Sequence, residues 1–342
     1  MLSDKPKCPP CEADGNTISA KLLCCTGCHV AHYCGLDHQA ADRESHKRAC
    51  NAIKKAQKRL DFEETKLRNH PPDYFTPENL FEEHAGHFWG ILETRNYMRA
   101  RYALIEAFLK VKTYAAAKAA HDHGMDCLRL CRSDNMGVRD MLPALKLRLG
   151  QDQECYDFVK WYATTGEDIH YDWGDMDSPY LNLKGEDVFE KLPANATHRF
   201  ASLPHTIALT LLKLRLKLDV RVLQRSSIIG TKVPQEIMDN IQEHIVGDIV
   251  SRRKDIIGAT DLTPLNKELD RQIQALIKVV NMRNPQFWNS LFEPGNHLTA
   301  RFATYSPGSV QEMQRALQSS FDSWIETPGA IDLLKEYLHR QG

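Results

Sequence analysis

The sequence predicts a mostly α-helical protein that carries a small metal-stabilised module near its N-terminus. Eight cysteine and histidine residues are spaced as four pairs between Cys8 and Cys50. After about residue 77, apolar residues recur at steps of three and four, the period of an α-helix, and no convincing sheet is visible. We therefore expect a small finger followed by a helical-repeat or helical-bundle domain.

Length and composition indicate an ordinary globular chain. Its 342 residues, enough for about two or three domains, are 42% hydrophobic and 26% charged. The net charge of −1 gives no basic field for nucleic acid. The first residues, MLSDKPKCPP, lack the apolar core of a signal peptide, and no uncharged apolar run of about 18 residues predicts a membrane span. We expect an intracellular protein of the nucleus or cytoplasm.

The N-terminal cysteines and histidines have the spacing of metal ligands. In a reducing compartment, such a cluster indicates metal rather than disulfides. Two cysteines separated by two residues share one tight turn, and ligands four positions apart share one face of a helical turn. Because structural Zn²⁺ takes four ligands, eight predict two zinc ions, and the spacing allows sequential or interleaved pairing. The four pairs are Cys8-x2-Cys11, Cys25-x2-Cys28, Cys34-x3-His38 and His46-x3-Cys50.

Cysteines outside these pairs have other expected roles. Cys24 stands beside Cys25, but only Cys25 keeps the two-residue spacing to Cys28, so Cys24 is expected to be a bystander. Three later cysteines lie in apolar helical patterns and are expected to be small core residues. These are Cys127, Cys131 and Cys155.

Residues 8–50 resemble the MYND zinc finger. The resemblance rests on Cys25-Thr-Gly-Cys28, Tyr33-Cys34-x3-His38-Gln39 and His46-Lys47-x2-Cys50, and it covers about an eighth of the chain. A RING finger is the nearest competitor, but it usually ends in cysteine pairs separated by two residues. The resemblance implies interleaved pairing. One ion would take Cys8, Cys11, Cys34 and His38, and the other Cys25, Cys28, His46 and Cys50.

The same resemblance implies a peptide-binding module, often for proline-containing segments. The positions that match the family's peptide-contact surface are Thr26, Gln39 and Arg43. Two departures stand out. His38 occupies a position that is normally cysteine, and imidazole nitrogen also binds zinc well. Arg43 stands where the family usually has tryptophan, which puts the apolar wall of the peptide groove in question.

Residues 51–72 are expected to form a linker helix. Asn51 to Asn69 contains no Gly or Pro and is rich in helix formers, and His70-Pro71-Pro72 ends the helix. Its basic residues predict a solvated face, with a nuclear-import or nucleic-acid patch as the alternative. They include Lys54, Lys55, Lys58 and Arg59.

Residues 73–342 are expected to form an all-helical domain. Four helices over about 87–165 resemble tetratricopeptide-like repeats, with an irregular bundle as the alternative. Within the third helix, 138–149, Pro143 predicts a kink. Residues 167–179 predict an acidic aromatic surface loop rather than a second kind of metal site. Residues 212–222 alternate like a strand but also show helical steps, and we expect helix.

Helix-start signals also place four helices in the C-terminal third. They begin near Pro234, Thr263-Pro264, Ser309 and Thr327-Pro328.

No recognised catalytic motif appears, and we expect an adaptor for protein–protein interaction, not an enzyme. One alternative is a MYND-containing lysine methyltransferase. Such enzymes carry an Asn-His-x-Cys element, of which Asn296-His297 matches only the first two residues. The other is a nucleic-acid-associated regulator. His121-Asp122-His123 is expected to lie on a solvated helix face rather than to bind metal.

Overall fold

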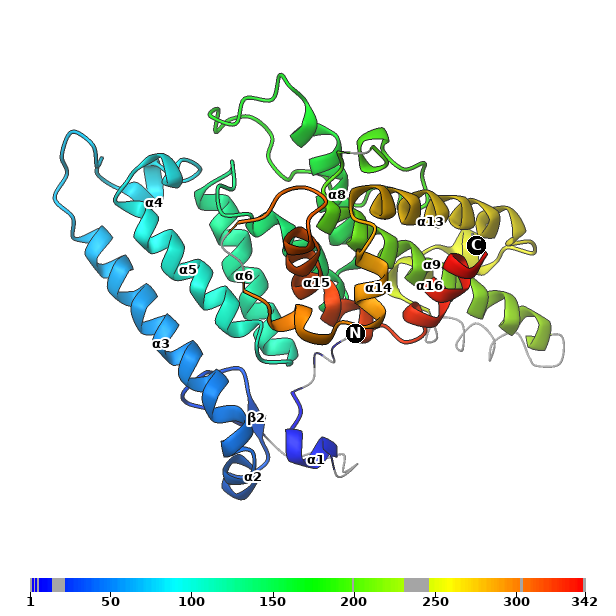
Figure 1. The fold of residues 1–342 in the computed structure, drawn as a ribbon, viewed down its shortest axis with the longest axis horizontal. Coiled ribbons are helices and arrows are strands. Elements are labelled where there is room, and N and C mark those ends of the chain that lie inside the picture. The colour runs from blue at the N-terminus through cyan, green and yellow to red at the C-terminus, as the bar shows by residue number, and fades with distance from the viewer. Residues whose placement is uncertain are drawn as a thin grey trace. The chain divides into compact units, whose positions relative to one another are not determined.

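The computed structural model describes residues 2, 4, 6–13, 22–198, 200–230, 246–301 and 304–340. It divides into two compact units (Figure 1): Met1–Leu149 with Asp172–Tyr180, and Gly150–Tyr171 with Leu181–Gly342. Apart from one two-stranded sheet and isolated bridges, the described residues form helices and loops. The predicted mostly α fold with an N-terminal finger is confirmed.

The first unit contains the finger and the helices that follow it. Its strands pair antiparallel, with Leu23 opposite Tyr33. Its long helices pack in series, α3 along α5, α5 along α6, and α6 against α7. The elements are α1 (Pro9–Ala13), β1 (Leu23–Cys24), β2 (His32–Tyr33), α2 (Leu36–Ala41), α3 (Arg43–Arg68), α4 (Leu80–Glu83), η1 (Phe88–Gly90), α5 (Thr94–Phe108), α6 (Tyr114–Leu130), η2 (Val138–Asp140) and α7 (Leu142–Arg148).

The helix α3 joins the finger to the rest of this unit. It begins inside the finger and continues through most of the predicted linker segment. Ile53, Leu60 and Leu67 recur every seven residues and are buried, so one face of α3 packs along α5. Lys54, Lys55, Lys58 and Arg59 are exposed, which is the predicted solvated face. The predicted domain limits at residues 50 and 72 stay predictions.

The helices expected over residues 98–162 are α5, α6, α7 and α8, but the third differs from its prediction. Residues 138–149 do not form one kinked helix. They form the short η2 and then α7, in which Pro143 lies in the first turn. A proline there disturbs nothing, because first-turn N–H groups have no partner within the helix. A specific tetratricopeptide-like repeat is not shown, and α8 belongs to the second unit.

A long loop returns to the first unit at Asp172–Tyr180. The Arg132 guanidinium donates hydrogen bonds to the carbonyl oxygens of Asp175, Met176 and Ser178, at 3.1, 2.8 and 3.1 Å. One side chain therefore satisfies three backbone acceptors of the loop. Within this loop Trp173 packs edge-on against Tyr180.

One expectation for this unit was wrong. His121 is not on a solvated face, because it is buried and its Nε2 lies 3.1 Å from the Lys146 Nζ on α7. Burial and the neighbouring Lys146 lower the pKa of His121. His123 stacks on Phe108. Periodicity alone did not reveal that α7 covers this side of α6.

The second unit is built around one long helix. Its helices α8, α11, α13, α15 and α16 all contact α9. The elements are α8 (Asp152–Ala163), η3 (Thr165–Glu167), η4 (Ala194–Ala196), α9 (Leu203–Gly230), α11 (Asp248–Ser251), α12 (Lys254–Ile257), α13 (Thr263–Arg283), α14 (Phe287–Phe292), η5 (Gly295–Thr299), α15 (Val310–Ile325) and α16 (Ala330–His339). Residues 212–222 are therefore helix.

The helix α9 buries charged residues as well as leucines. Lys213, Arg215 and Lys217 are at most 6% exposed. The Arg215 guanidinium lies 2.6 Å from an Asp152 carboxylate oxygen, and the Lys217 ammonium lies 2.7 Å from that of Asp270. These charged groups thus lie inside the unit, where their carboxylate partners offset the cost of burial. No helix among the described residues is long and apolar enough to cross a membrane.

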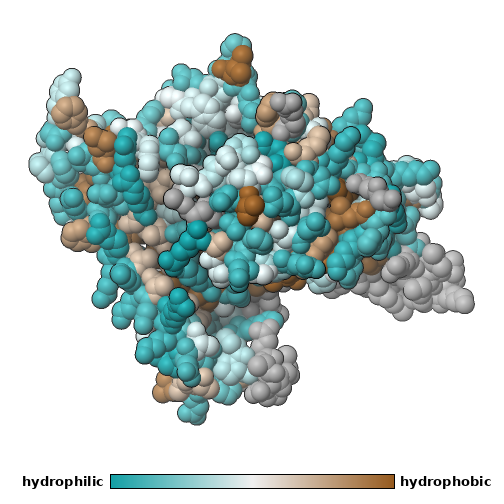
Figure 2. All heavy atoms as spheres, viewed as in Figure 1, coloured by the Kyte–Doolittle hydropathy of each residue, from teal (hydrophilic) through white to brown (hydrophobic). Residues whose placement is uncertain are grey.

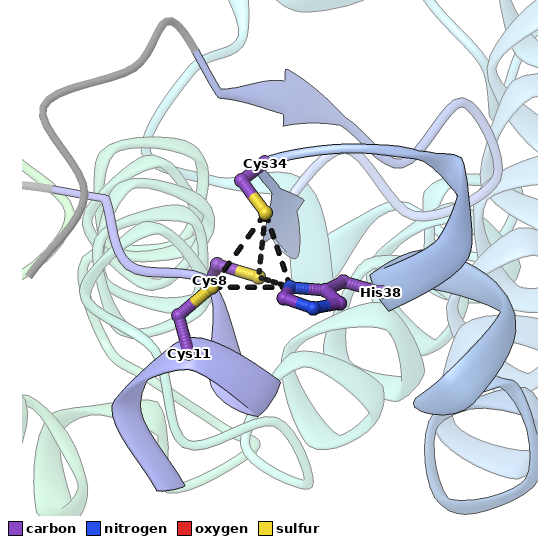
Figure 3. A group of neighbouring side chains, drawn as sticks. All are labelled: Cys8, Cys11, Cys34 and His38. Atoms are coloured by element: carbon purple, nitrogen blue, oxygen red, sulfur yellow. Dashed lines mark hydrogen bonds between the residues drawn. The ribbon is translucent and has the colours of Figure 1, made fainter. Parts of the chain in front are cut away.

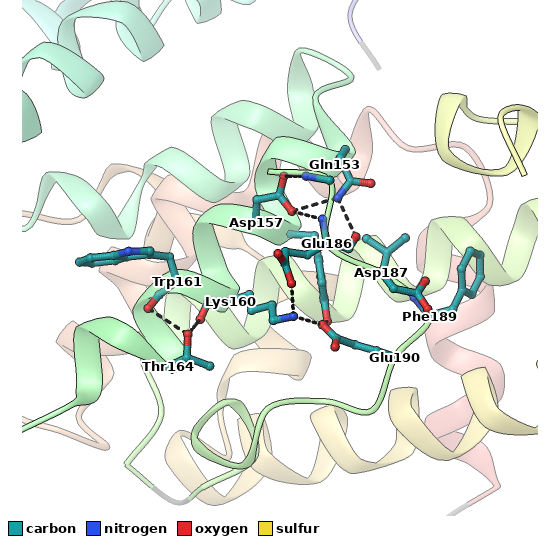
Figure 4. Close-up of polar contacts among 12 residues, drawn as sticks. Gln153, Asp157, Lys160, Trp161, Thr164, Glu186, Asp187, Phe189 and Glu190 are labelled. Atoms are coloured by element: carbon teal, nitrogen blue, oxygen red, sulfur yellow. Dashed lines mark hydrogen bonds and ion pairs between the residues drawn. The ribbon is translucent and has the colours of Figure 1, made fainter. Parts of the chain in front are cut away.

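A polar network joins the loop segment 185–190 to α8 (Figure 4). The Asp157 carboxylate accepts hydrogen bonds from the backbone N–H groups of Gly185 and Glu186, at 2.8 and 3.0 Å. Lys160 forms ion pairs with both Glu186 and Glu190. These contacts anchor an otherwise irregular segment to a regular helix.

The C-terminal helices follow their predicted starts with one difference. Thr263 opens α13, and the Ser309 hydroxyl caps α15 by accepting from the Glu312 N–H at 3.1 Å. The last helix begins at Ala330, because the Thr327 hydroxyl instead donates to the Ser323 carbonyl and accepts from Arg215. The helix predicted from Pro234 lies mainly outside the described residues.

Core and surface agree with this arrangement. The three later cysteines are buried as expected, at 1%, 3% and 0% exposure for Cys127, Cys131 and Cys155. On the face drawn in Figure 2, hydrophobic residues are scattered among hydrophilic ones. Scattered exposed apolar residues are normal for a folded protein.

Candidate metal centre

The first cluster joins the first and third ligand pairs. Cys8 precedes α1, Cys11 lies on α1, Cys34 follows β2 and His38 lies on α2. Figure 3 shows the four side chains directed toward a common centre. The His38 Nδ1 lies 3.5, 3.1 and 3.1 Å from the sulfurs of Cys8, Cys11 and Cys34.

The second cluster joins the other two pairs. Cys25 follows β1, Cys28 lies in the next turn, and His46 and Cys50 lie one helical turn apart on α3. The Cys25 and Cys50 sulfurs are 3.8 Å apart, and the Cys28 sulfur is 3.4 Å from the His46 Nε2. The two clusters therefore interleave along the chain.

The geometry of both clusters fits a tetrahedral zinc ion. With Zn–S near 2.3 Å and Zn–N near 2.0–2.1 Å, sulfurs are about 3.8 Å apart and sulfur and nitrogen about 3.6 Å. The ligand atoms of each cluster lie within 4.8 Å of one another. These separations are far too long for disulfides, whose sulfurs are about 2.05 Å apart, and none of the ten cysteines forms a disulfide.

The electrostatics of the clusters also call for a cation. In the first, burial and then the neighbouring thiols Cys34 and Cys8 raise the pKa of Cys11 to about 12. Burial alone would raise the pKa of Cys8, but hydrogen bonds from backbone N–H groups and His38 outweigh burial and lower this pKa to about 7. Without a cation, like charges at this distance cannot all ionise. A divalent ion would supply the charge that stabilises three thiolates.

The second cluster has the same imbalance. Burial raises the pKa of Cys50 to about 12, and the charges of Cys28 and Cys25 add to the effect. The pKa of Cys25 is about 6, because hydrogen bonds from the backbone at Gly27 and Cys28 outweigh the effect of burial. Each cluster therefore contains one readily ionised thiol, Cys8 or Cys25, and one whose charged form needs a cation, Cys11 or Cys50.

Hydrogen bonds beyond the ligands hold both clusters in place. The Cys25 N–H donates to the Ala31 carbonyl at 2.8 Å, which closes the turn that carries Cys28. The Tyr33 hydroxyl donates to the Asp42 carboxylate at 2.7 Å and connects β2 to the start of α3. Such contacts orient metal ligands and tune their affinity. Sequence reasoning identified the ligands but not these supports.

The remaining sequence-predicted residues fall outside the clusters. Cys24 is exposed on β1 and belongs to neither cluster. Thr26 is exposed in the turn before Cys28, Gln39 is half-buried on α2, and Arg43 is exposed at the start of α3. Their role in peptide contact stays a prediction.

Sequence reasoning also missed an apolar residue beside these positions. Leu36 is 72% exposed and lies three residues before Gln39, so the two share a face of α2. The three-residue spacing from Leu36 to Gln39 is the sequence signal that could have identified it. Among the described residues, only the two clusters above bring three or more potential metal ligands together. The acidic residues of the 167–179 loop do not form such a group.

Two closed Cys₃His clusters with interleaved ligands define a small zinc finger. A family model described as the MYND finger matches residues 8–50. Residues 8–50 are therefore a MYND finger, a zinc-binding module for protein interaction, and its two sites fit two zinc ions. No curated protein and no solved structure matches the chain.

Proposed function

We propose that this chain is an intracellular adaptor that binds other proteins through its MYND finger and its helical region, without catalysing a reaction. The observation that carries the proposal is the closed ligand set of both clusters. Four protein ligands per zinc ion leave no position for a reactive water, and such sites are structural. The finger then serves to present a surface.

Proline-containing peptides are the proposed ligands of that surface. Thr26 and Gln39 offer hydrogen-bonding groups at the finger's exterior. Arg43 stands where the family usually has tryptophan, so that apolar side chain is missing. Leu36, one helical turn from Gln39, supplies an exposed apolar side chain in its place. Extended proline-rich segments bind such surfaces at a low entropic cost because their backbone is already restricted.

The test is a titration of proline-containing peptides against the intact chain, followed by fluorescence anisotropy. The intact chain is needed because α3 runs from the finger onto α5. We expect Gln39→Ala to weaken binding about fivefold, because loss of an uncharged hydrogen bond removes about 1 kcal/mol of binding free energy. Arg43→Trp is expected to strengthen binding. Absence of binding by all variants would leave the finger a structural role only.

Partners of the intact chain are identified by affinity capture in parallel. A Cys28→Ser variant removes one ligand of the second cluster. Partners that bind through the finger are expected to be lost in this variant, whereas partners of the helical region are retained. A tetratricopeptide-like arrangement of residues 87–165 is part of the proposal for that region.

A second candidate function is nucleic-acid association. Its support is the exposed basic stripe of α3, formed by Lys54, Lys55, Lys58 and Arg59. Arg59 already pairs with Glu63 on the same helix, which reduces the charge available to a phosphate backbone. Binding to duplex that falls steeply with salt would favour this function over the adaptor. A lysine methyltransferase is the remaining alternative, and β1 and β2 are the only paired strands among the described residues.

A further inference from the structure

A groove of about 450 Å³ lies between the MYND finger and α6. One wall is the end of the zinc-binding turn, Gly27 to Val30, and the other is the N-terminal half of α6. Ile53 of α3 and Phe108 of α5 complete it. The volume falls within the range of about 300 to 1,000 Å³ typical of ligand-binding pockets.

The groove exists because α6 presents small side chains to the finger. Ala115 and Ala119 lie one turn apart on the face that lines it, together with Lys118 and Asp122. Both alanines are half-buried, so larger residues there would fill the space. The Thr113 hydroxyl donates to the Val30 carbonyl at 2.8 Å and fixes the finger against the start of α6. This hydrogen bond holds the two walls of the groove together.

The chemistry of the lining selects an uncharged, apolar occupant. Val30, Ile53 and Phe108 are apolar and at most 5% exposed. The lining carboxylate of Asp122 and the lining ammonium of Lys118 bond to one another at 2.7 Å and offset each other's charge. The other polar side chains of the lining are His29, Gln57 and Tyr114. A charged ligand would lose hydration here without gaining an opposite charge.

The groove begins beside the peptide-binding face that is proposed for the finger. Thr26, on the proposed peptide-binding face, directly precedes Gly27, which lines the groove. Consecutive Cα atoms are about 3.8 Å apart. An extended segment that contacts Thr26 therefore needs only about two further residues to enter the groove.

We propose that this groove binds the uncharged apolar flank of the partner segment that the finger binds, so that the finger and α6 form one composite docking surface. The inference rests on the proposed function. It explains why the finger is bonded to α6 through Thr113 rather than joined by a free linker. Specificity would then depend on helical residues outside residues 8–50.

The experiment uses the zinc-loaded intact chain and a phage-displayed library of random twelve-residue peptides. Selected peptides are synthesised, and their affinities are measured by calorimetry for the wild type, Ala115→Leu and Ala119→Leu. The matched control is Ala52→Leu, a half-buried alanine of α3 that does not line the groove. Zinc content and circular dichroism establish that each variant is folded.

We expect peptides with an apolar flank to bind at least tenfold more weakly to both groove variants and within twofold of wild type to the control. Replacing the flank by Gly-Ser should weaken binding to the wild type but cause no further loss in Ala119→Leu. This peptide-side change tests the groove even where a leucine variant fails to fold. Peptides weakened by Gln39→Ala but unaffected by the groove variants and by flank replacement would overturn the groove and leave the proposed function standing. No selected peptide at all would overturn both.

Discussion

A Cβ atom at Gly27 would stand 2.8 Å from the sulfur of Cys50, although the two residues are far apart in the sequence. Real Cβ atoms do not approach a sulfur so closely, so only glycine fits at this position. The turn and α3 come this close because Cys25, Cys28 and Cys50 converge on the same site. This close approach explains why glycine stands at position 27, between the two cysteines of the second ligand pair.

Gly27→Ala is expected to weaken the second zinc site selectively. The added methyl group must displace the Cys50 sulfur, and disturbing the contacts that orient a metal ligand typically costs about 10- to 100-fold in affinity. Competition with a chromogenic chelator should show one zinc ion bound normally and one bound at least tenfold more weakly. The control is Gly35→Ala, where a Cβ meets no atom within 4 Å. Equal losses in both variants would contradict the steric explanation.

Two adjacent cysteines are expected to differ completely in zinc binding. Cys25 is buried in the second cluster, whereas Cys24 is exposed and outside it. Native mass spectrometry should find two zinc ions in Cys24→Ser and one firmly bound ion in Cys25→Ser. If Cys24→Ser also lost an ion, the ligand assignment from spacing and geometry would be wrong.

Removal of zinc is expected to unfold the finger and leave the second unit folded. A 43-residue module buries too little apolar surface to fold alone, and structural zinc contributes on the order of 10 kcal/mol per ion. Hydrogen exchange after treatment with a strong chelator should show loss of protection in residues 22–50. Helices such as α13 and α15, which pack on α9, should keep theirs. Unchanged protection in the finger would contradict a metal-dependent fold.

Asp219→Asn is expected to stabilise the second unit at neutral pH. Burial raises the pKa of Asp219 from 3.8 to about 6, with a further contribution from Asp152. The folded state therefore holds this proton more tightly than the unfolded chain, so stability falls as pH rises from about 4 to 6 and stays lower above that. Asparagine removes the buried charge and keeps an oxygen for the Gly247 N–H, which is 2.9 Å away.

The expected gain in the free energy of unfolding is about 1 to 3 kcal/mol at pH 7, since each pKa unit corresponds to about 1.4 kcal/mol. At pH 3.5, where Asp219 is mostly protonated in both states, the gain is expected to fall below about 0.5 kcal/mol. Urea denaturation at pH 3.5 and pH 7 measures both values. An equal effect at the two pH values would show that the carboxylate charge is not its cause.

Local spacing along the sequence determined the metal ligands and most helices. Pairs such as Cys25-x2-Cys28 and His46-x3-Cys50 aim two ligands from one turn, so they need no knowledge of the rest of the fold. The same holds for α6 and for the Ser309 cap, which depend on neighbours a few residues away. Eight ligands therefore predicted two zinc ions without any long-range information.

Only the tertiary structure decided how these local pieces combine. Spacing left sequential and interleaved pairing open, and the approach of α1 to α2 and of the Cys25–Cys28 turn to α3 selected the interleaved form. It also determined that His38 uses Nδ1 whereas His46 uses Nε2. Which partner a buried side chain meets, as for His121 and Arg215, depends on packing between distant segments, and periodicity within one helix carries no information about those segments.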